Sequence, residues 1–346
     1  MASTIKNNLI NLVDIPFSIL DLVPVLDGNS IAQSFHNSLS LAQKAEALGF
    51  NRFWMSEHHN MEGVASSATV VLIGYIAGNT KTIRVGSGGI MLPNHAPLVV
   101  AEQFGSLETL YPHRIDLGLG RAPGTDQLTS AALRRDMKGF VDDFPSNVVE
   151  LKNYFSHQVT DKVQAVPGKG LEVPIWLLGS STYSAQLAGI LGLPFAFASH
   201  FAPALLQPAL KIYRDSFRTS DALKQPYAMA CVNIVAADTD EEANKLATSL
   251  YAFFLNVVRG TSFPLKAPVD NLESIWNENE EAIVKQMLTY NFIGDANSIE
   301  RQLETFVNET QINELMVVSN IFDHAARLHS YEIIAGVKKI KPVPLN

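Results

Sequence analysis

Residues 17–56 read FSILDLVPVLDGNSIAQSFHNSLSLAQKAEALGFNRFWMS, which is a short apolar run, a helical pattern and a second apolar run. Between the runs, apolar residues recur at steps of three and four, as on the buried face of a helix. They are Ile31, Phe35, Leu39, Ala42, Ala45 and Leu48. Ser30-Ile31-Ala32-Gln33 matches a capping box, and Gly49 is placed to end the helix in a left-handed conformation. The stretch predicts a strand, a helix and a second strand.

Apolar runs of this kind alternate with helical patterns along nearly the whole chain. We count eight, at residues 17–20, 52–56, 83–86, 115–119, 175–178, 195–199, 229–235 and 315–319. Several are apolar at successive positions, as strands covered on both faces require. Eight strand–helix repeats with right-handed crossovers predict an α/β fold, the closed parallel (β/α)8 TIM barrel. An open doubly wound sheet would normally have a glycine-rich turn after the first strand, and Leu22-Val23-Pro24-Val25 is not such a turn.

The spacing between the runs widens twice, after the fourth strand and after the seventh. We assign these gaps to insertions at about 122–173 and 258–310 within one domain that spans 1–346. The second insertion contains helical patterns near 272–290 and 299–307.

Composition excludes several classes of function. The chain has 26 basic and 34 acidic residues, and its net charge of −8 argues against a nucleic-acid partner, which needs a concentrated basic face. Cys231 is the only cysteine, which excludes a disulfide scaffold and a multi-thiolate metal site and suits a reducing, cytoplasmic setting. Residues 173–210 lack Asp, Glu, Lys and Arg, but prolines interrupt them, so we expect no membrane span. The amino terminus has no apolar stretch typical of a signal peptide.

The helical pattern at about 66–78 is apolar nearly all round. A helix on the outside of a barrel should have one polar face. We therefore expect a further surface, that of a second subunit, to cover this helix.

Chemistry in such barrels takes place at the carboxyl ends of the strands. After the fifth predicted strand, Gly179-Ser180-Ser181-Thr182 leads into a helix that starts near Tyr183, and Arg121 follows the neighbouring fourth strand. Hydroxyls and free N–H groups at a helix start, together with a guanidinium, make a phosphate clamp. The alternative is that Ser180 or Ser181 only caps the helix and that Arg121 pairs with a carboxylate such as Asp126. The convergence on adjacent strands favours the clamp.

Two further strand ends carry candidate residues. Gly88 and Gly89 follow the third strand, where glycine permits close approach of a planar ligand or simply forms a bulge. Glu57-His58-His59 follows the second strand and raises the question of a metal, but neighbouring residues on a strand point to opposite faces. One histidine facing the site suits general acid–base chemistry better. Hydrogen bonding within the loop remains the alternative for both histidines.

Three blocks of sequence resemble the bacterial luciferase-like family of flavin-dependent monooxygenases. They are 49–59 (GFNRFWMSEHH), 85–93 (VGSGGIMLP) and 114–121 (RIDLGLGR), and the resemblance runs from about Phe17 to Val337. Residues 176–203 look more like a subgroup of bacterial single-subunit members than like luciferase itself. The resemblance implies reduced FMN, O2 as co-substrate and a C4a-hydroperoxyflavin intermediate.

The resemblance also implies roles for individual residues. His58 matches the active-site histidine beside the flavin, and Glu57 matches a supporting carboxylate. Gly88-Gly89 matches a non-proline cis peptide under the flavin ring. Arg121 and Ser180 match the residues that meet the FMN phosphate. The remaining cofactor-binding residues that we expect are Gly179, Ser181, Tyr183 and Ser199.

Some positions depart from the luciferase pattern. Luciferase has a cysteine where this chain has Gly120 and a carboxylate where it has Gly179, and residues 259–271 differ in composition from its mobile loop. These differences argue against light emission and a long-chain aldehyde substrate, but they leave flavin binding intact.

The resulting hypothesis is a two-component monooxygenase for a small organic substrate. A separate NAD(P)H:flavin reductase would supply reduced FMN, because the chain lacks a glycine-rich nicotinamide fingerprint. We expect a homodimer that pairs through the helices near 66–78 and 97–110, as is usual in the family. The rival hypotheses are an F420-dependent oxidoreductase of the same fold, a non-catalytic flavin-binding protein and a metal-dependent barrel hydrolase.

Overall fold

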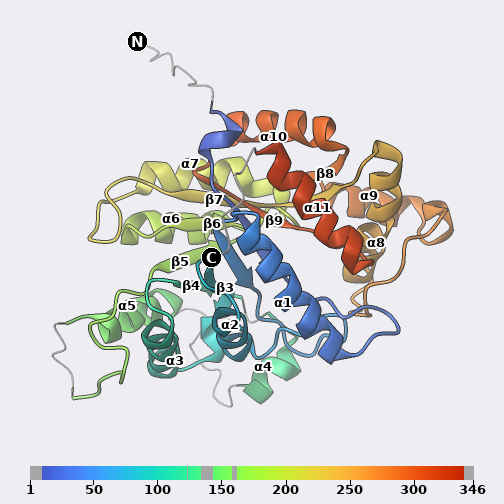
Figure 1. The fold of residues 1–346 in the computed structure, drawn as a ribbon. Coiled ribbons are helices and arrows are strands. Elements are labelled where there is room, and N and C mark those ends of the chain that lie inside the picture. Colours follow the sequence, from blue (N-terminus) through green and yellow to red (C-terminus); the bar gives the residue numbers. More distant parts are fainter. Residues whose placement is uncertain (1–9, 123, 134–142, 158–161, 339–346) are drawn as a thin grey trace, which may run out of the picture.

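The eight predicted strands form a closed parallel barrel with helices around its outside (Figure 1). The computed structural model describes residues 10–122, 124–133, 143–157 and 162–338. Both ends of the predicted domain 1–346, and parts of its predicted first insertion at 122–173, lie outside the described residues. Within the described residues, no helix is long and apolar enough to cross a bilayer. The predicted TIM barrel is confirmed.

The elements follow one another in regular alternation. The strands are β1 (Phe17–Asp21), β2 (Arg52–Met55), β3 (Arg84–Met91), β4 (Ile115–Gly120), β5 (Ile175–Gly179), β6 (Phe195–Phe197), β7 (Ala228–Ala236), β8 (Asn291–Gly294) and β9 (Glu314–Val318). The helices are α1 (Ile31–Ala47), α2 (Thr69–Gly78), α3 (Pro97–Leu110), α4 (Gln127–Leu133), α5 (Phe144–Phe155), α6 (Thr182–Leu191), α7 (Leu206–Ser216), α8 (Asp240–Val258), α9 (Glu278–Met287), α10 (Ala296–Thr310) and α11 (His324–Val337).

The ring closes between β7 and β9, with β8 as an additional strand. Residues 228–230 of β7 pair with β6, whereas residues 233–236 pair with β8. Asn233 pairs with both β8 and β9. β8 therefore pairs with the second half of β7, on the edge whose first half pairs with β6. The sequence analysis missed β8, which is a four-residue strand between two helical patterns.

Strand β3 is longer than the predicted run 83–86. It continues to Met91, and its register against β4 shifts between Ser87 and Ile90. Gly88 and Gly89 therefore lie within the strand, at a bulge, and not beyond its end. The bulge that the glycines predicted is present.

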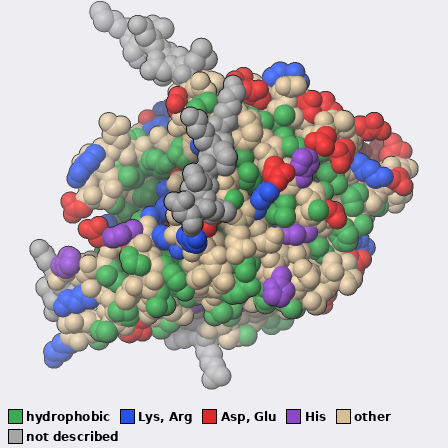
Figure 2. Space-filling view, in the orientation of Figure 1, with side chains coloured by type: hydrophobic (Ala, Val, Ile, Leu, Met, Phe, Trp, Pro, Cys, Tyr) green, Lys and Arg blue, Asp and Glu red, His purple; other side chains and the backbone are tan. Residues whose placement is uncertain are grey.

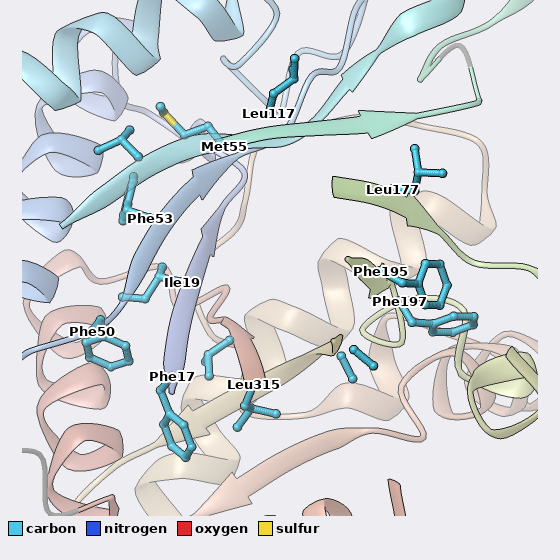
Figure 3. Packing of buried hydrophobic residues seen from close by; sticks show 14 of the residues in the cluster. Phe17, Ile19, Phe50, Phe53, Met55, Leu117, Leu177, Phe195, Phe197 and Leu315 are labelled. Atoms are coloured by element: carbon cyan, nitrogen blue, oxygen red, sulfur yellow. The ribbon is translucent and has the colours of Figure 1, made fainter. Parts of the chain in front are cut away.

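Side chains alternate between the two faces of the barrel wall, as the period of a strand requires. Outward-facing side chains pack against the helices (Figure 3), among them Phe17, Ile19, Phe53, Leu117, Phe195 and Leu315. Inward-facing Leu20, Trp54, Trp176, Met229 and Met316 fill the middle of the barrel. The rings of Trp54 and Trp176 meet edge to face, with their centroids 5.1 Å apart. The barrel interior is thus a packed core.

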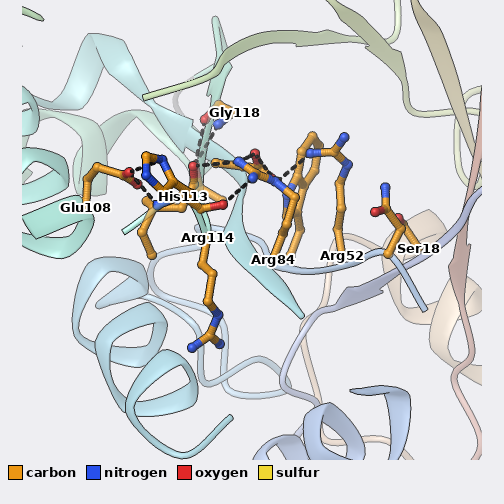
Figure 4. Close-up of polar contacts among 12 residues, drawn as sticks. Ser18, Arg52, Arg84, Glu108, His113, Arg114 and Gly118 are labelled. Carbon is orange, nitrogen blue, oxygen red and sulfur yellow. Dashed lines mark hydrogen bonds and ion pairs between the residues drawn. The ribbon is translucent and has the colours of Figure 1, made fainter. Parts of the chain in front are cut away.

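Buried ion pairs close the amino-terminal end of the barrel (Figure 4). Arg52 places Nη1 2.7 Å from Asp116 Oδ2 and Nε 2.9 Å from Glu314 Oε1. Arg84 Nη2 lies 2.6 Å from Asp116 Oδ1. Both carboxylates are fully buried, and burying such charges costs free energy unless each is paired, as here. The ion pairs stabilise this end of the barrel, and we expect the reaction to take place at the opposite end.

Helix α1 begins and ends where the sequence predicted. The Ser30 side chain accepts a hydrogen bond from the N–H of Gln33, and Gly49 has φ +78°. The predicted capping box is only half formed, because the Gln33 side chain donates to Asn37 Oδ1. One helical turn farther on, Asn37 offers an acceptor on the same face.

Helix α2 begins at Thr69, inside the predicted range 66–78. Leu72, Ile73 and Ile76 are buried, whereas Val71 is 70% exposed. On α3, Leu110 is 67% exposed. On the face drawn in Figure 2, acidic side chains gather over α9 and α10, as the net charge of the chain would suggest.

Candidate active site

The predicted site residues come from the carboxyl ends of β2 to β6. Residues 57–59 follow β2, Gly88 and Gly89 lie in β3, and Arg121 follows β4. Residues 179–183 run from the last residue of β5 into the first turn of α6, and Ser199 follows β6. Because parallel strands end on the same side of a barrel, these residues share one face of the molecule.

Glu57 is the buried centre of a hydrogen-bond network. Its Oε1 lies 2.8 Å from Nε2 of His59 and 2.8 Å from Nε2 of His95, and its Oε2 accepts from the N–H of Met91 at 3.0 Å. Burial raises the pKa of Glu57, but the bonds from His95, His59 and Met91 outweigh burial and leave the pKa lowered. An ionised carboxylate therefore joins the loop after β2 to the end of β3.

His58 has a hydrogen-bond partner outside this network. Its Nδ1 lies 3.0 Å from Oγ of Ser56, which leaves Nε2 as the nitrogen on the opposite edge of the ring. Burial lowers the pKa of His58, against the attraction of Glu57, and His59 lowers it further. The imidazole is therefore neutral near pH 7, the state in which a histidine accepts a proton.

His200, after β6, is a buried histidine close to His58. Burial, with a smaller contribution from His58, lowers the pKa of His200 to about 3. Its carbonyl accepts a 2.6 Å hydrogen bond from the Asn233 side chain. Neighbouring Ser199 is fully buried and donates to the carbonyl of Cys231 at 2.6 Å. The Ser199 hydroxyl is thus engaged in the barrel wall, and its predicted role toward a cofactor stays a prediction.

The glycine pair in β3 fits closely against the neighbouring strands. The Gly88–Gly89 peptide bond is cis, as the resemblance implied. A Cβ on Gly89 would lie 2.7 Å from the carbonyl oxygen of Gly118, and a Cβ on Gly88 would lie 2.8 Å from Leu20 Cδ1. Gly89 therefore has no room for a side chain against the backbone of β4, whereas the atom nearest to Gly88 is the end of the Leu20 side chain. Contact of this peptide with a ligand stays a prediction.

Arg121 and the start of α6 lie together. The guanidinium carbon of Arg121 is 4.3 Å from the centre of the Tyr183 ring. Ser181 is the N-cap residue of α6, yet no side-chain hydrogen bond caps this helix. The alternative of a serine cap with an Arg121–Asp126 pair is therefore wrong for the described residues. Asp126 instead accepts from Asn60, Leu128 and Thr129.

The positive charge of Arg121 thus lies beside the N–H groups at the start of α6. Among the residues that the structure describes, no carboxylate lies within ion-pairing distance of Arg121. A helix start and an unpaired guanidinium together favour an anion. A phosphate group fits this arrangement.

Sequence reasoning missed several supporting residues. His95 was not among the predicted site residues, although it bonds to Glu57. The roles of Ser56 and Ser66, whose hydroxyl oxygens are 3.2 Å apart, were not foreseen. Ser66 stands at the start of the predicted helix 66–78 but lies in the loop before α2, and no sequence pattern indicates its contact with Ser56.

The comparison with known families agrees with this geometry. The model of the luciferase-like monooxygenase family matches residues 15–336. The chain belongs to that family. Together with the monooxygenases among its relatives, this membership identifies it as a flavin-dependent monooxygenase.

Two relatives cover nearly the full length of this family member. A luciferase-like monooxygenase of Escherichia coli (strain K12) is 52% identical over 326 residues, which are 94% of this chain and 97% of the relative. An N-acetyl-S-alkylcysteine monooxygenase of Bacillus subtilis (strain 168) is 31% identical over 330 residues, which are 93% of this chain and 97% of the relative.

Solved structures of this fold differ in the cofactor that they bind. Apo-MsnO8 is 33% identical with a TM-score of 0.85, over 95% of this chain and 100% of that chain. The oxygenating constituent of 3,6-diketocamphane monooxygenase from Pseudomonas putida, in complex with FMN, has 18% identity and a TM-score of 0.72, over 96% and 100%. An F420-dependent secondary alcohol dehydrogenase has 14% identity and a TM-score of 0.68, over 95% and 98%. The last two share the fold alone.

Proposed function

We propose that this protein uses reduced FMN and O2 to oxygenate a small organic substrate. The observation that carries the proposal is Arg121, which stacks on Tyr183 beside the uncapped start of α6 without a carboxylate partner in the described residues. The FMN phosphate, a dianion, would complete this arrangement. Reduced FMN, when bound, supplies the electrons that activate O2.

The chain's own residues anchor and orient the cofactor in this proposal. Arg121 and the hydroxyls of Ser180 and Ser181 hold the phosphate, with the backbone N–H groups of α6. A Cβ on Gly179 would lie 2.6 Å from Ser184 Oγ, so glycine lets the end of β5 pack against the first turn of α6. The Gly88–Gly89 segment supports the ring system at the end of β3.

His58 is the proton-transfer group of the proposed reaction. It is neutral near pH 7 because burial lowers its pKa, and its Nδ1 is held by Ser56, so that Nε2 exchanges the proton. Glu57 keeps the loop after β2 in place through His59 and His95. Closure of the site around these residues would exclude water.

A separate NAD(P)H:flavin reductase supplies the reduced cofactor, and we place both proteins in the cytoplasm. The Pseudomonas putida structure is described as an oxygenating constituent, as expected for one half of such a pair. We also propose a homodimer through α2 and α3, where exposed Val71 and Leu110 would be covered. Sedimentation of wild type and of Val71→Glu with Leu110→Glu tests the dimer.

Binding titrations test the cofactor. We expect Arg121→Ala to weaken FMN binding by about 1.5–3 kcal/mol, the range for a hydrogen bond to a charged group. Riboflavin, which lacks the phosphate, should bind wild type and variant alike. Arg218→Ala, on an exposed residue beyond α7, is the matched control. Equal FMN affinities for wild type and Arg121→Ala would refute the phosphate assignment, and saturable binding of F420 in place of FMN would favour the deazaflavin reaction.

Turnover separates the monooxygenase from a flavin-binding protein without activity. Wild type, FMN, NADPH and an unrelated flavin reductase are mixed, and oxygen uptake is compared with hydrogen peroxide formed. An N-acetyl-S-alkylcysteine is the first substrate to try, since a 31% identical relative is named for it. A productive substrate should lower the peroxide yield, and His58→Gln should restore it while FMN still binds. If no tested compound lowers the peroxide yield despite tight FMN binding, a binding function is favoured.

A further inference from the structure

A line of buried hydroxyls leads away from His58. Its Nδ1 is 3.0 Å from Oγ of Ser56, and that Oγ is 3.2 Å from Oγ of Ser66. Ser56 is 2% exposed and Ser66 is fully buried. The three groups therefore form a chain of hydrogen bonds with solvent excluded from its serine end.

The backbone around these serines is fixed by further buried contacts. Thr69 Oγ1 lies 3.1 Å from the carbonyl oxygen of Ser56 and 2.8 Å from that of Ser66, and so ties the end of β2 to the first turn of α2. On the other side, the N–H of Ala65 donates to the carbonyl of Val23 at 3.0 Å. The positions of both serines are thus set by the meeting of β1, β2 and α2.

Val23 shows that this arrangement is held against local preference. Its φ is +53°, a left-handed conformation that a β-branched residue rarely adopts. Asp21 Oδ1 accepts from the Val23 N–H at 3.1 Å, and Asp21 itself pairs with buried Arg327 at 2.9 Å. Strained residues of this kind persist where the surroundings over-determine them, often beside functional sites.

The hydroxyl chain can satisfy either neutral form of His58. When Nδ1 carries the proton, it donates to Ser56, and the Ser56 hydroxyl turns to donate to Ser66. When Nε2 carries the proton, Ser66 donates to Ser56, and Ser56 donates to Nδ1. Each serine oxygen donates one hydrogen bond and accepts others. Neither form leaves Oγ of Ser56 or Nδ1 of His58 without a partner.

We propose that Ser56 and Ser66 are positioning residues that form a hydroxyl relay, which lets Nε2 of His58 either accept or donate a proton without losing the bond at Nδ1. The relay rests on the proposed function of His58 in proton transfer. The charged or titratable groups around His58 are Glu57, His59 and His200. They influence the charge of the ring, whereas the relay contacts Nδ1 directly and selects the tautomer.

The two serines have different expected effects. In Ser66→Ala, the Ser56 hydroxyl keeps only Nδ1 as a partner, so the Nε2–H form dominates and Nε2 no longer accepts a proton readily. In Ser56→Ala, Nδ1 loses its partner in both forms. Ser66→Cys keeps a weak donor and acceptor of similar size and should lie between wild type and Ser66→Ala.

The test reads the tautomer directly. Long-range proton–nitrogen NMR spectra of protein labelled with ¹⁵N-histidine, without flavin, report which ring nitrogen of His58 carries the proton, and His58→Gln assigns the signals. We expect Ser66→Ala to move the His58 nitrogen shifts toward the Nε2–H form. We also expect at least a fivefold loss of kcat for oxygenation, with a changed pH profile and with FMN affinity unchanged. Ser38→Ala, a buried serine of α1, is the control.

The outcomes separate the relay from the function of His58. If Ser56→Ala and Ser66→Ala leave the His58 shifts and the pH profile of kcat as in wild type, the relay is refuted. If the shifts move but His58→Gln still oxygenates normally, the relay stands and the role of His58 in the reaction fails. If Ser66→Ala does not fold, Ser66→Cys and Ser56→Ala decide by the same two measurements.

Discussion

The guanidinium carbon of Arg121 lies over the ring of Tyr183, 4.3 Å from its centre. Stacking of this kind is worth about 0.5–1 kcal/mol at a partly exposed site. Because Tyr183 lies in the first turn of α6, the contact holds the positive charge beside the N–H groups at the start of that helix.

Tyr183→Leu should therefore weaken FMN binding about two- to fivefold, which is that stacking energy expressed as an affinity ratio. Tyr183→Phe keeps the ring and should bind as wild type does. Isothermal titration with FMN measures both. If the leucine and phenylalanine variants bind equally well, the ring has no part in placing Arg121.

Glu57→Gln should destabilise the protein by about 2–3 kcal/mol, because bonds from two histidines to a buried carboxylate are replaced by weaker ones. Urea unfolding at pH 7 measures this difference. Glu304→Gln, on the exposed side of α10, should change the unfolding free energy by less than about 0.5 kcal/mol. If Glu57→Gln lowers the unfolding free energy as little as the control does, the hydrogen bonds of Glu57 contribute little to stability.

His200 should make stability fall on mild acidification. Its pKa is about 3 in the folded protein and about 6.5 in an unfolded chain. Between these values the unfolded state binds the additional proton, so the unfolding free energy falls as pH falls, by up to about 1.4 kcal/mol per pH unit. The contribution is complete above about pH 6.5. His200→Gln should show a shallower slope between about pH 5 and 6.5 in chemical denaturation, and equal slopes would contradict the assignment.

Gly118→Ala should cost about 2–3 kcal/mol, because the added Cβ would lie 2.2 Å from the carbonyl oxygen of Ser87. Gly336→Ala, at an exposed position of α11 with open space around it, should instead stabilise by about 0.5–1 kcal/mol. Thermal unfolding of both variants checks the two signs. If both variants were destabilised, the close packing of β3 against β4 would not explain the effect of Gly118→Ala.

The ring of eight strands was predictable because burial on both faces leaves uninterrupted apolar runs. β8 escaped prediction, since four residues paired along one half of β7 carry no distinct period. The end of β3 was misplaced for a different reason. Glycine weakens a strand or marks a bulge within it, and here Gly88 and Gly89 continue the strand through a bulge.

The candidate site was predictable in part. Arg121 and the start of α6 were paired from their positions on neighbouring strands, and the structure places Arg121 against Tyr183. The cap by Ser181, which was the alternative to the clamp, does not form. Which hydroxyl turns toward a backbone N–H depends on loop geometry that residue types do not specify.

Residue order alone determined the alternation of strand and helix, the cap of α1 by Ser30 and the family blocks, because these depend on neighbours within a few positions. Only the closed barrel brings His95, from the next strand end, to Glu57 and places Ser66 against Ser56. It also gives Asp126 a partner other than Arg121, namely Asn60. Such pairs join loops from different strands, so their distances follow from strand register and ring closure.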